Sequence, residues 1–287
     1  MIDTPNRITA DGVYLMDCIK GMHMMPDDSV DLIIADPPYN LSKGGNWTWD
    51  NSDSSISMGG NWNKVMEQWD SMPFVDYWKF TASWLNEAKR VLKSTGSMWI
   101  FGTYHNIGII NTLCQLNNVE IINEVIWYKR NAFPNLSGRR LTASHETILW
   151  CHSGDGKREY YFDYDYAKNG SFNEDQLKHA GKQMRTVWDI PNNKTKEELA
   201  YGKHPTQKPL RLLNRMIRLS SKSGDIMLTP FSGSGSECVA AVQAGRHYIG
   251  FEIEREYYEL SLRRLNAVTD TPTSESYRTA QPAPMLF

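Results

Sequence analysis

Asp36-Pro37-Pro38-Tyr39 combines a carboxylate, two rigid prolines and an aromatic ring. It follows the near-continuous apolar stretch 30–35, which is typical of a parallel strand buried on both faces. Two prolines exclude a helix and a central strand, so the chain must turn where open α/β sheets bind ligands. The carboxylate and an exposed carbonyl can accept hydrogen bonds from an exocyclic amine, while the ring can stack on a planar base. The alternative is a proline-capped turn with Tyr39 in the core.

A second candidate site is the turn Phe231-Ser232-Gly233-Ser234-Gly235-Ser236 between a predicted strand and a predicted helix. Glycines let the backbone approach a ligand closely, and the next helix offers free N–H groups. The turn is close to G-x-G-x-x-G, but Cys238 takes the place of the third glycine. Glu252 ends the following predicted strand, 17 positions after Gly235, where a carboxylate can accept two ribose hydroxyls. An ordinary strand-end acid is the alternative, but together the two features favour a nucleoside-containing cofactor.

The elements that must position these motifs follow from the apolar periodicity. Helices alternating with strands predict a three-layer α/β domain. The expected strands are 13–16, 30–35, 97–102, 121–128, 145–150, 225–228 and 247–252, and the expected helices are 18–25, 74–92, 106–117, 210–221, 237–244 and 256–267.

The 287 residues are 40% hydrophobic and 22% charged, which is typical of a globular protein. We expect a single domain over 1–269, with a flexible loop at 41–69, an inserted region at 129–203 and a flexible tail at 270–287. No apolar run approaches the ~20 residues that a membrane span needs, and the N-terminus has no signal pattern. The expected location is therefore the cytoplasm. Four scattered cysteines argue against a zinc site and a disulfide framework.

Charge is unevenly distributed along the chain. The net charge is −2, but residues 129–222 hold 18 basic and 10 acidic residues, a local excess of +8. A basic middle in a near-neutral chain indicates a local contact with a polyanion. The alternative is a solvated charged face.

The motifs carry a resemblance over about residues 14–265. Asp-Pro-Pro-Tyr resembles the catalytic motif of amino-group DNA methyltransferases, and the Phe-x-Gly-x-Gly-x turn resembles their S-adenosylmethionine loop. The catalytic motif precedes the cofactor loop, with a basic segment between them, which is the permuted order of the β class. The segments 135–137, 139–140, 146–150 and 204–209 are most similar to small N6-adenine methyltransferases of restriction-modification systems, of the DpnII and MboII types.

The resemblance implies a Rossmann-like S-adenosylmethionine-dependent methyltransferase fold with a mainly parallel mixed sheet. It implies that Asp36 and the Pro37 carbonyl accept the amine protons of a flipped adenine, beside Pro38, and that the Tyr39 ring, rather than its hydroxyl, stacks on the base. The implied cofactor residues are Asp17, Cys18, Asp36, His204, Thr206, Lys208, Pro230, Phe231, Ser232, Gly233, Ser234, Gly235, Ser236 and Glu252. Asp17 could also be only a helix cap. Thr229 stands where the family usually has Asp. The resemblance therefore does not imply the contact that this carboxylate would make with the cofactor.

The implied partner is DNA, as a double strand or also as a single strand, and a homodimer is left open. The expected DNA-binding residues are Asn40, Lys129, Arg130, Arg139 and Arg140. An arginine can bond a guanine edge or hold a phosphate, although Arg139 and Arg140 could instead pair with surface acids. Because the base is inaccessible inside a duplex, it must be flipped out or taken from a single strand. The resemblance implies that a bacterium or a phage encodes the protein.

Three alternatives remain. An N4-cytosine methyltransferase uses the same amine chemistry but usually has Ser in place of Asp36. A dinucleotide-dependent oxidoreductase would carry its glycine turn after the first strand, whereas here the turn lies near residue 233. A catalytically silent nucleic-acid-binding protein would not need Asp36 and Tyr39 together.

Overall fold

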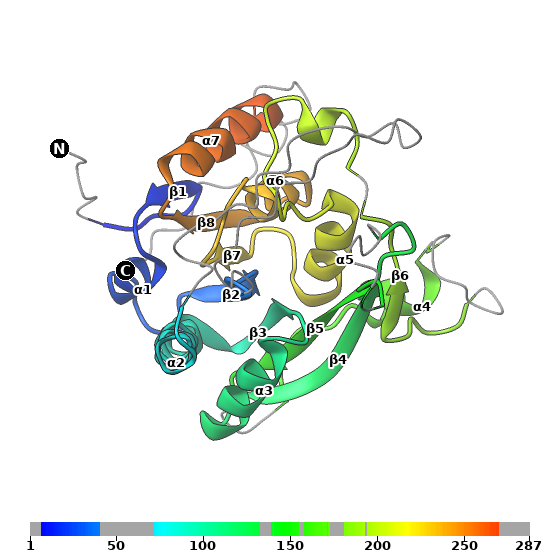
Figure 1. The fold of residues 1–287 in the computed structure, drawn as a ribbon, viewed down its shortest axis with the longest axis horizontal. Helices are drawn as coiled ribbons and strands as arrows, with labels where there is room; N and C mark the ends of the chain where they lie inside the picture. The colour runs from blue at the N-terminus through cyan, green and yellow to red at the C-terminus, as the bar shows by residue number, and fades with distance from the viewer. Residues whose placement is uncertain are drawn as a thin grey trace.

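The computed structural model describes residues 7–40, 72–132, 139, 141–154, 158–170, 172, 181–192 and 194–269. Within these residues, eight strands form one sheet in the order β1-β8-β7-β2-β3-β5-β4-β6 (Figure 1). The strands are β1 (Gly12–Leu15), β2 (Val30–Ala35), β3 (Leu92–Gly102), β4 (Glu120–Tyr128), β5 (His145–His152), β6 (Val187–Asp189), β7 (Ile226–Thr229) and β8 (His247–Glu252). The helices are α1 (Cys18–His23), α2 (Phe74–Val91), α3 (Ile107–Leu116), α4 (Tyr164–Asn169), α5 (Leu210–Ser220), α6 (Ser236–Gln243) and α7 (Arg255–Thr269), with a 3₁₀ turn η2 (Glu197–Leu199).

Helices pack on both faces of the sheet, which gives three layers (Figure 1). Helices α1, α2 and α3 share one apolar core with one face, around Met22, Trp84 and Ile110. Helices α5, α6 and α7 cover the opposite face, around Leu212 and Leu265. The prediction of a three-layer, Rossmann-like α/β fold with a mainly parallel mixed sheet is therefore confirmed.

The central strand β2 explains where a site can form. Its side chains alternate between the two cores and are almost all buried, as the apolar run predicted. It lies between β7 and β3, and β1, β8, β7, β2 and β3 are all parallel. Their carboxyl ends therefore meet at one edge of the sheet, where Asp36, Pro230 and Glu252 lie.

The start of β3 differs from the prediction. The sequence indicated a loop at Lys93–Gly96, but the strand begins at Leu92, immediately after α2. Leu92 leaves the helix with ψ of 126°, and a Cβ at Gly96 would lie 2.7 Å from the Asp31 carbonyl oxygen. Tight contact with β2, with a shift of register between Val30 and Leu32, therefore extends the strand through residues with loop-like composition.

The segment 129–203 contributes to the sheet itself. β5 pairs antiparallel with β3 and β4, and the short β6 pairs parallel with β4 at the far edge. The sequence predicted β5 but not β6, α4 or η2, which are short and lie in polar stretches. The predicted loop 41–69 and tail 270–287 lie outside the described residues, and the single-domain boundary stays a prediction.

None of the helices in the described part of the chain is long and apolar enough to cross a membrane.

Candidate functional site

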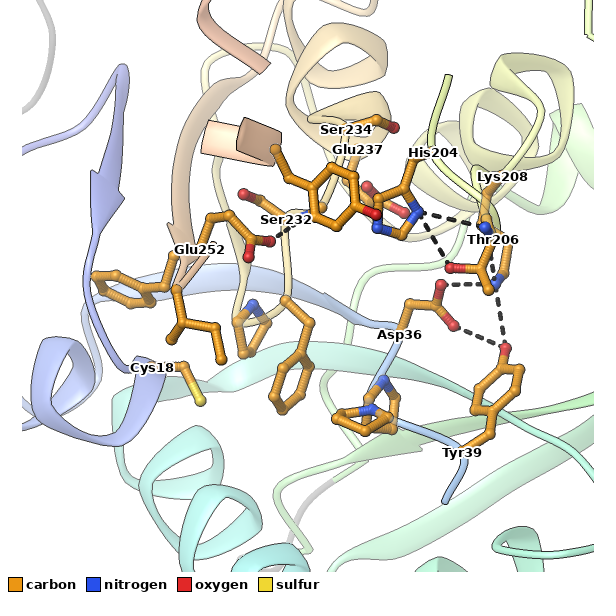
Figure 2. A pocket seen from close by; sticks show the side chains of 18 of the residues that line it. Cys18, Asp36, Tyr39, His204, Thr206, Lys208, Ser232, Ser234, Glu237 and Glu252 are labelled. Atoms are coloured by element: carbon orange, nitrogen blue, oxygen red, sulfur yellow. Dashed lines mark hydrogen bonds and ion pairs between the residues drawn. The ribbon is translucent and has the colours of Figure 1, made fainter. Parts of the chain in front are cut away.

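A cavity of about 330 Å³ opens at the carboxyl edge of the sheet, and both predicted motifs line it (Figure 2). Its size falls within the range of small-molecule sites. The predicted residues that line it are Asp17, Cys18, Asp36, Pro37, Pro38, Tyr39, His204, Thr206, Lys208, Pro230, Phe231, Ser232, Gly233, Ser234 and Glu252. Segments far apart in the sequence thus meet in one place.

Two predicted cofactor residues do not line the cavity. Gly235 is the N-cap of α6, with a left-handed φ of 73°, and a Cβ there would lie 2.7 Å from Ser261 on α7. The Ser236 hydroxyl lies 2.9 Å from Arg264, which also donates to Ser234. Both residues therefore shape the glycine turn and hold it against α7, while a direct contact with a cofactor stays a prediction.

Asp36 lies at the centre of a network of charged side chains. Lys208 Nζ donates a hydrogen bond of 2.5 Å to Asp36 Oδ2, and the Tyr39 hydroxyl lies 2.7 Å from Oδ1. The lysine side chain is 3% exposed and that of Asp36 is 14% exposed. The loop before α5 thus places a buried cation against the predicted catalytic acid. This contact was not predicted, because the sequence assigned Lys208 to the cofactor.

Glu146 is the member of this network that the sequence analysis missed. It lies on β5, and its Oε2 is 3.0 Å from the Tyr39 hydroxyl and 3.6 Å from Lys208 Nζ. Lys129, directly after β4, pairs with the other carboxylate oxygen of Glu146 at 2.9 Å. An acid inside the apolar strand run 146–151 was the available signal, since a buried acid needs a partner.

The network balances two acids against two cations. Burial alone would lower the pKa of Lys208, but the charges of Asp36 and Glu146 raise it. Burial opposes ionisation of Glu146 too, yet Lys208 and Lys129 hold the pKa of Glu146 below its usual value. Burial raises the pKa of Asp36, and Lys208 opposes that rise. The lysine therefore stays charged and supports two carboxylates on either side of Tyr39.

The Tyr39 ring is 8% exposed and forms part of the cavity wall. Its hydroxyl lies within hydrogen-bond distance of Asp36, Glu146 and Lys208, at 2.7, 3.0 and 3.1 Å. The hydroxyl therefore orients the acid, a part that the sequence did not predict. Stacking of the ring on a base stays a prediction.

The opposite end of the cavity has a different chemistry. Asp17 caps α1 by accepting a hydrogen bond from the Lys20 N–H at 3.0 Å, as the alternative for this residue proposed, and it also lines the cavity. Cys18 is buried, and burial raises the pKa of its thiol well above the usual range. Glu252 accepts backbone hydrogen bonds from Gly233 at 2.7 Å and Glu254 at 2.8 Å. The carboxylate is thereby fixed beside the glycine turn, with lone pairs left for a ligand.

The glycine turn approaches its neighbours closely. Gly233 has φ of 47°, and a Cβ there would lie 3.3 Å from the His204 ring. That ring packs edge-on against Tyr257 at 4.2 Å between centroids, and its Nδ1 lies 3.2 Å from the Thr206 hydroxyl. The predicted residues His204 and Thr206 thus line the cavity, and the His204 ring lies against the glycine turn.

Apolar side chains complete the wall, and the sequence analysis missed them. Phe80 from α2 and Phe251, Ile253 and Tyr257 from the β8–α7 region line the cavity. Flat apolar surfaces near Asp17 and Glu252 suit the ring of a nucleoside. Phe251 and Ile253 flank Glu252 in the chain, so their position beside a predicted ribose contact was the signal.

The predicted DNA-binding residues do not form one cluster. Asn40 forms two hydrogen bonds with the Met72 backbone, at 2.7 and 3.0 Å. Lys129 belongs to the Glu146 network, and Arg130 pairs with Asp189 at 2.8 Å. Arg139 is exposed, and Arg140 lies outside the described residues. Part of the basic excess therefore neutralises acids inside the protein, and the DNA contacts stay predictions.

His204 gives a first testable expectation. Burial lowers the pKa of His204 to about 4, and the charges of Lys208 and Arg264 add to this effect. An unfolded chain binds this proton near pH 6.5, so the folded state binds fewer protons between those values. We expect the free energy of unfolding to fall as the pH drops from about 6.5 to about 4, with up to one proton taken up through this residue.

Urea unfolding at a series of pH values tests this expectation. His204→Gln should lose less stability on acidification than the wild type. His145→Gln, at the exposed start of β5, is the matched control for replacement of a histidine by glutamine. Parallel acid curves for the wild type and His204→Gln would contradict the assignment.

Comparison with known proteins gives consistent matches. The family model described as DNA methylase matches residues 30–263. The Type II methyltransferase M2.DpnII of Streptococcus pneumoniae is 40% identical over 255 residues, which cover 89% of each chain. The Type II methyltransferase M.HinfI of Haemophilus influenzae is 38% identical over 260 residues, which cover 89% of this chain and 68% of M.HinfI.

Solved structures show the same fold. The PvuII DNA methyltransferase, described as cytosine-N4-specific, has a TM-score of 0.69 at 16% identity, covering 97% of this chain and 98% of that one. The M1.HpyAVI complex with SAM has a TM-score of 0.58 at 24% identity, covering 88% of this chain and 98% of that one. Both chains share the architecture that places the cavity at the carboxyl edge of the sheet.

Proposed function

Because this chain belongs to the DNA methylase family that includes Type II methyltransferases, we propose that it methylates the N6 amine of adenine in DNA at a specific sequence, with S-adenosylmethionine as methyl donor. The observation that carries the proposal is the shared cavity of Asp36 and Glu252. Asp36, after β2, could accept hydrogen bonds from an amine, and Glu252, at the end of β8, could accept them from a ribose. Both residues line the same cavity at the carboxyl edge of the sheet.

The residues present fit the cofactor. Glu252 offers a fixed carboxylate to ribose hydroxyls, and Phe80, Phe251 and Ile253 offer apolar surface to an adenine ring. The Ser232 hydroxyl is buried, and no described residue forms a hydrogen bond with it, so it has capacity for a polar ligand. When bound, S-adenosylmethionine supplies an electrophilic methyl group on its sulfonium.

The chain itself would position the amine. The lone pair of an exocyclic amine is delocalised into the purine ring, which makes the nitrogen a poor nucleophile. Asp36 and the Pro37 carbonyl would accept its two protons and favour a tetrahedral nitrogen with a free lone pair. Each carboxylate oxygen keeps acceptor capacity beside Tyr39 and Lys208. Catalysis would then rest on positioning and electrostatic stabilisation, with no covalent intermediate on the protein.

N4-cytosine methylation is the second candidate, because the family model covers both amine chemistries and PvuII shares the fold. Asp36 favours adenine, since the N4 enzymes usually carry Ser there. Incubation of the purified protein with DNA and cofactor, followed by mass spectrometry of the nucleosides, separates the two. We expect N6-methyladenine; N4-methylcytosine alone would replace the proposal, and neither product would refute it.

The finer properties of the partner follow from the same chemistry. A base must leave the duplex to enter a cavity lined by Tyr39 and His204, so base flipping is part of the proposal. Double-stranded DNA is the proposed substrate, and single-stranded DNA is compared in the same assay. Light scattering with and without DNA separates a monomer from a homodimer. The enzyme would act in the cytoplasm of a bacterium or of a phage-infected cell.

A second expectation concerns the DNA path. Arg139→Ala/Arg140→Ala should weaken DNA binding, because guanidinium groups hold phosphates or read guanine edges. A lost phosphate contact lowers the salt slope by about one unit for all sequences. A lost base contact relaxes one position of the methylated motif, by roughly 1–3 kcal/mol.

Titration of DNA at several salt concentrations and long-read sequencing of methylated DNA measure both effects. Arg255→Ala/Arg263→Ala, two exposed arginines on α7, is the control for the same change in net charge. If affinity, salt slope and methylated motif all stay at wild-type values, the pair does not contact DNA.

A further inference from the structure

Glu237 is a buried acid in the cavity that the chemistry described so far does not use. It lies in the first turn of α6, directly after the glycine turn, and its side chain lines the cavity. The residue is 4% exposed. Figure 2 shows it on the α6 side of the cavity, apart from the Glu252 end.

Its carboxylate lacks the partners that a buried acid needs. Among the described residues it forms no ion pair, and no other residue donates a hydrogen bond to it. Arg264 is close enough for its charge to act on Glu237, but its hydrogen bonds go to Ser234 and Ser236. Burial and the charge of Asp36 raise the pKa of Glu237 to about 7, because they outweigh its own backbone N–H and the charges of Lys208 and Arg264, which lower it. A buried, unpaired carboxylate costs stability, so its presence in a ligand cavity points to a cation that arrives with the ligand.

The position of Glu237 selects which cation this is. In the proposed function, which this inference deepens, the ribose lies at Glu252 and the reacting methyl group at Asp36. The amino-acid part of the cofactor then extends along the glycine turn towards α6. A sulfonium carries no hydrogen on sulfur, whereas an α-ammonium has three N–H donors for a carboxylate with unfilled acceptor sites.

We infer that Glu237 binds the α-ammonium group of the methionine part of S-adenosylmethionine. Thr229 agrees with this inference. It stands where the resemblance predicts an acid, yet it is buried, does not line the cavity, and its hydroxyl has no hydrogen-bond partner among the described residues. The carboxylate facing the amino-acid part of the cofactor therefore comes from the first turn of α6, after the glycine turn, instead of from the end of β7.

Calorimetry with three ligands tests the assignment. S-adenosylmethionine and S-adenosylhomocysteine both carry the ammonium, but only the first carries the sulfonium; 5′-methylthioadenosine carries neither. Glu237→Gln should weaken binding of the first two ligands by about tenfold or more, as the loss of a charged hydrogen bond predicts. Binding of 5′-methylthioadenosine should be unchanged. Glu252→Gln should weaken all three, because all three contain the ribose. Glu256→Gln, an exposed acid in the first turn of α7, is the matched control.

Thermal unfolding without ligand supplies an independent measurement. Removal of an unpaired buried charge should leave Glu237→Gln at least as stable as the wild type, while its ligand binding falls. A structural role for Glu237 would give the opposite pattern, with lower stability and unchanged binding, and would overturn the inference. Weaker binding of all three ligands, or of S-adenosylmethionine alone, would also overturn it. A wild-type protein that binds none of the three would refute the proposed function itself.

Discussion

Asp36→Ala should lower the rate of methyl transfer by about 10²-fold or more, on the scale of losing one preorganised electrostatic contact. The side chain is the predicted acceptor for the amine, and two groups fix its orientation: Lys208 at 2.5 Å and the Tyr39 hydroxyl at 2.7 Å. Asp36→Asn should retain more activity than Asp36→Ala, because one side-chain oxygen acceptor remains. Single-turnover formation of N6-methyladenine, measured by mass spectrometry, gives the rate.

Binding of S-adenosylmethionine separates this effect from general damage. Because Asp36 is one residue of a large cavity wall, affinity should fall much less than the rate. Asp31→Asn provides a control on the same strand, since Asp31 contacts Lys93 and the Ile226 N–H outside the cavity and asparagine keeps one oxygen acceptor. Turnover of Asp36→Ala near the wild-type value would remove Asp36 from the reaction.

The sequence predicted the parts of the fold that depend on local pattern. The apolar run of β2 and the periodicity of α5 gave elements whose bounds differ from the structure by at most one residue. The missed elements have a common cause. The three-residue β6 carries no period of its own and exists because it pairs with β4, and the extension of β3 depends on contact with Asp31 of β2.

The candidate site was predictable to the same extent. Asp36 and Glu252 each end an apolar strand, and parallel strands bring their ends to one edge, so the sequence suffices to place both. Glu146 could not be placed in this way, because its contact with Tyr39 spans 107 positions and depends on antiparallel pairing of β5. The assignment of Lys208 to the cofactor missed its contact with Asp36 for the same reason, since the two residues lie 172 positions apart.

The ion pairs around Lys208 also show how much of the basic segment 129–222 is available to bind a polyanion. Lys129, Arg130 and Lys208 all belong to the +8 segment, yet each pairs with an acid of the protein. Net charge over a sequence window therefore overstates the surface available to a polyanion. The exposed Arg139 is a better candidate for contact with DNA than the buried or half-buried lysines.

Lys208→Met should destabilise the protein by about 3–5 kcal/mol, the usual cost of breaking a buried ion pair by removing one partner. Methionine preserves the length and apolar stem of the side chain beside the Phe101 ring. It leaves the carboxylates of Asp36 and Glu146 facing each other across the Tyr39 hydroxyl without the cation between them. Methyl transfer should fall as well, because Asp36 loses one of the two groups that orient it.

A double-mutant cycle distinguishes lost charge from lost packing. Lys208→Met/Asp36→Asn should be more stable than Lys208→Met alone, since the second change removes one of the uncompensated acids. Lys93→Met breaks the more exposed ion pair with Asp31, at 2.7 Å, and should cost only about 0–1 kcal/mol. Urea unfolding of the four proteins of the cycle, and of this control, measures their free energies of unfolding. Additive effects in the cycle would mean that Lys208 stabilises the site by packing instead of charge.

The pH dependence of Lys208→Met follows from the same linkage. Burial raises the pKa of Asp36, and Lys208→Met removes the cation at 2.5 Å that opposes this rise. A carboxyl group whose pKa is higher in the folded state than in the unfolded chain favours folding at low pH, and this stability is lost as the pH rises through the folded value. The deficit of Lys208→Met relative to the wild type should therefore shrink as the pH is lowered from 8 towards about 5. A deficit that stays constant across this range would show that the ion pair with Asp36 does not stabilise the site.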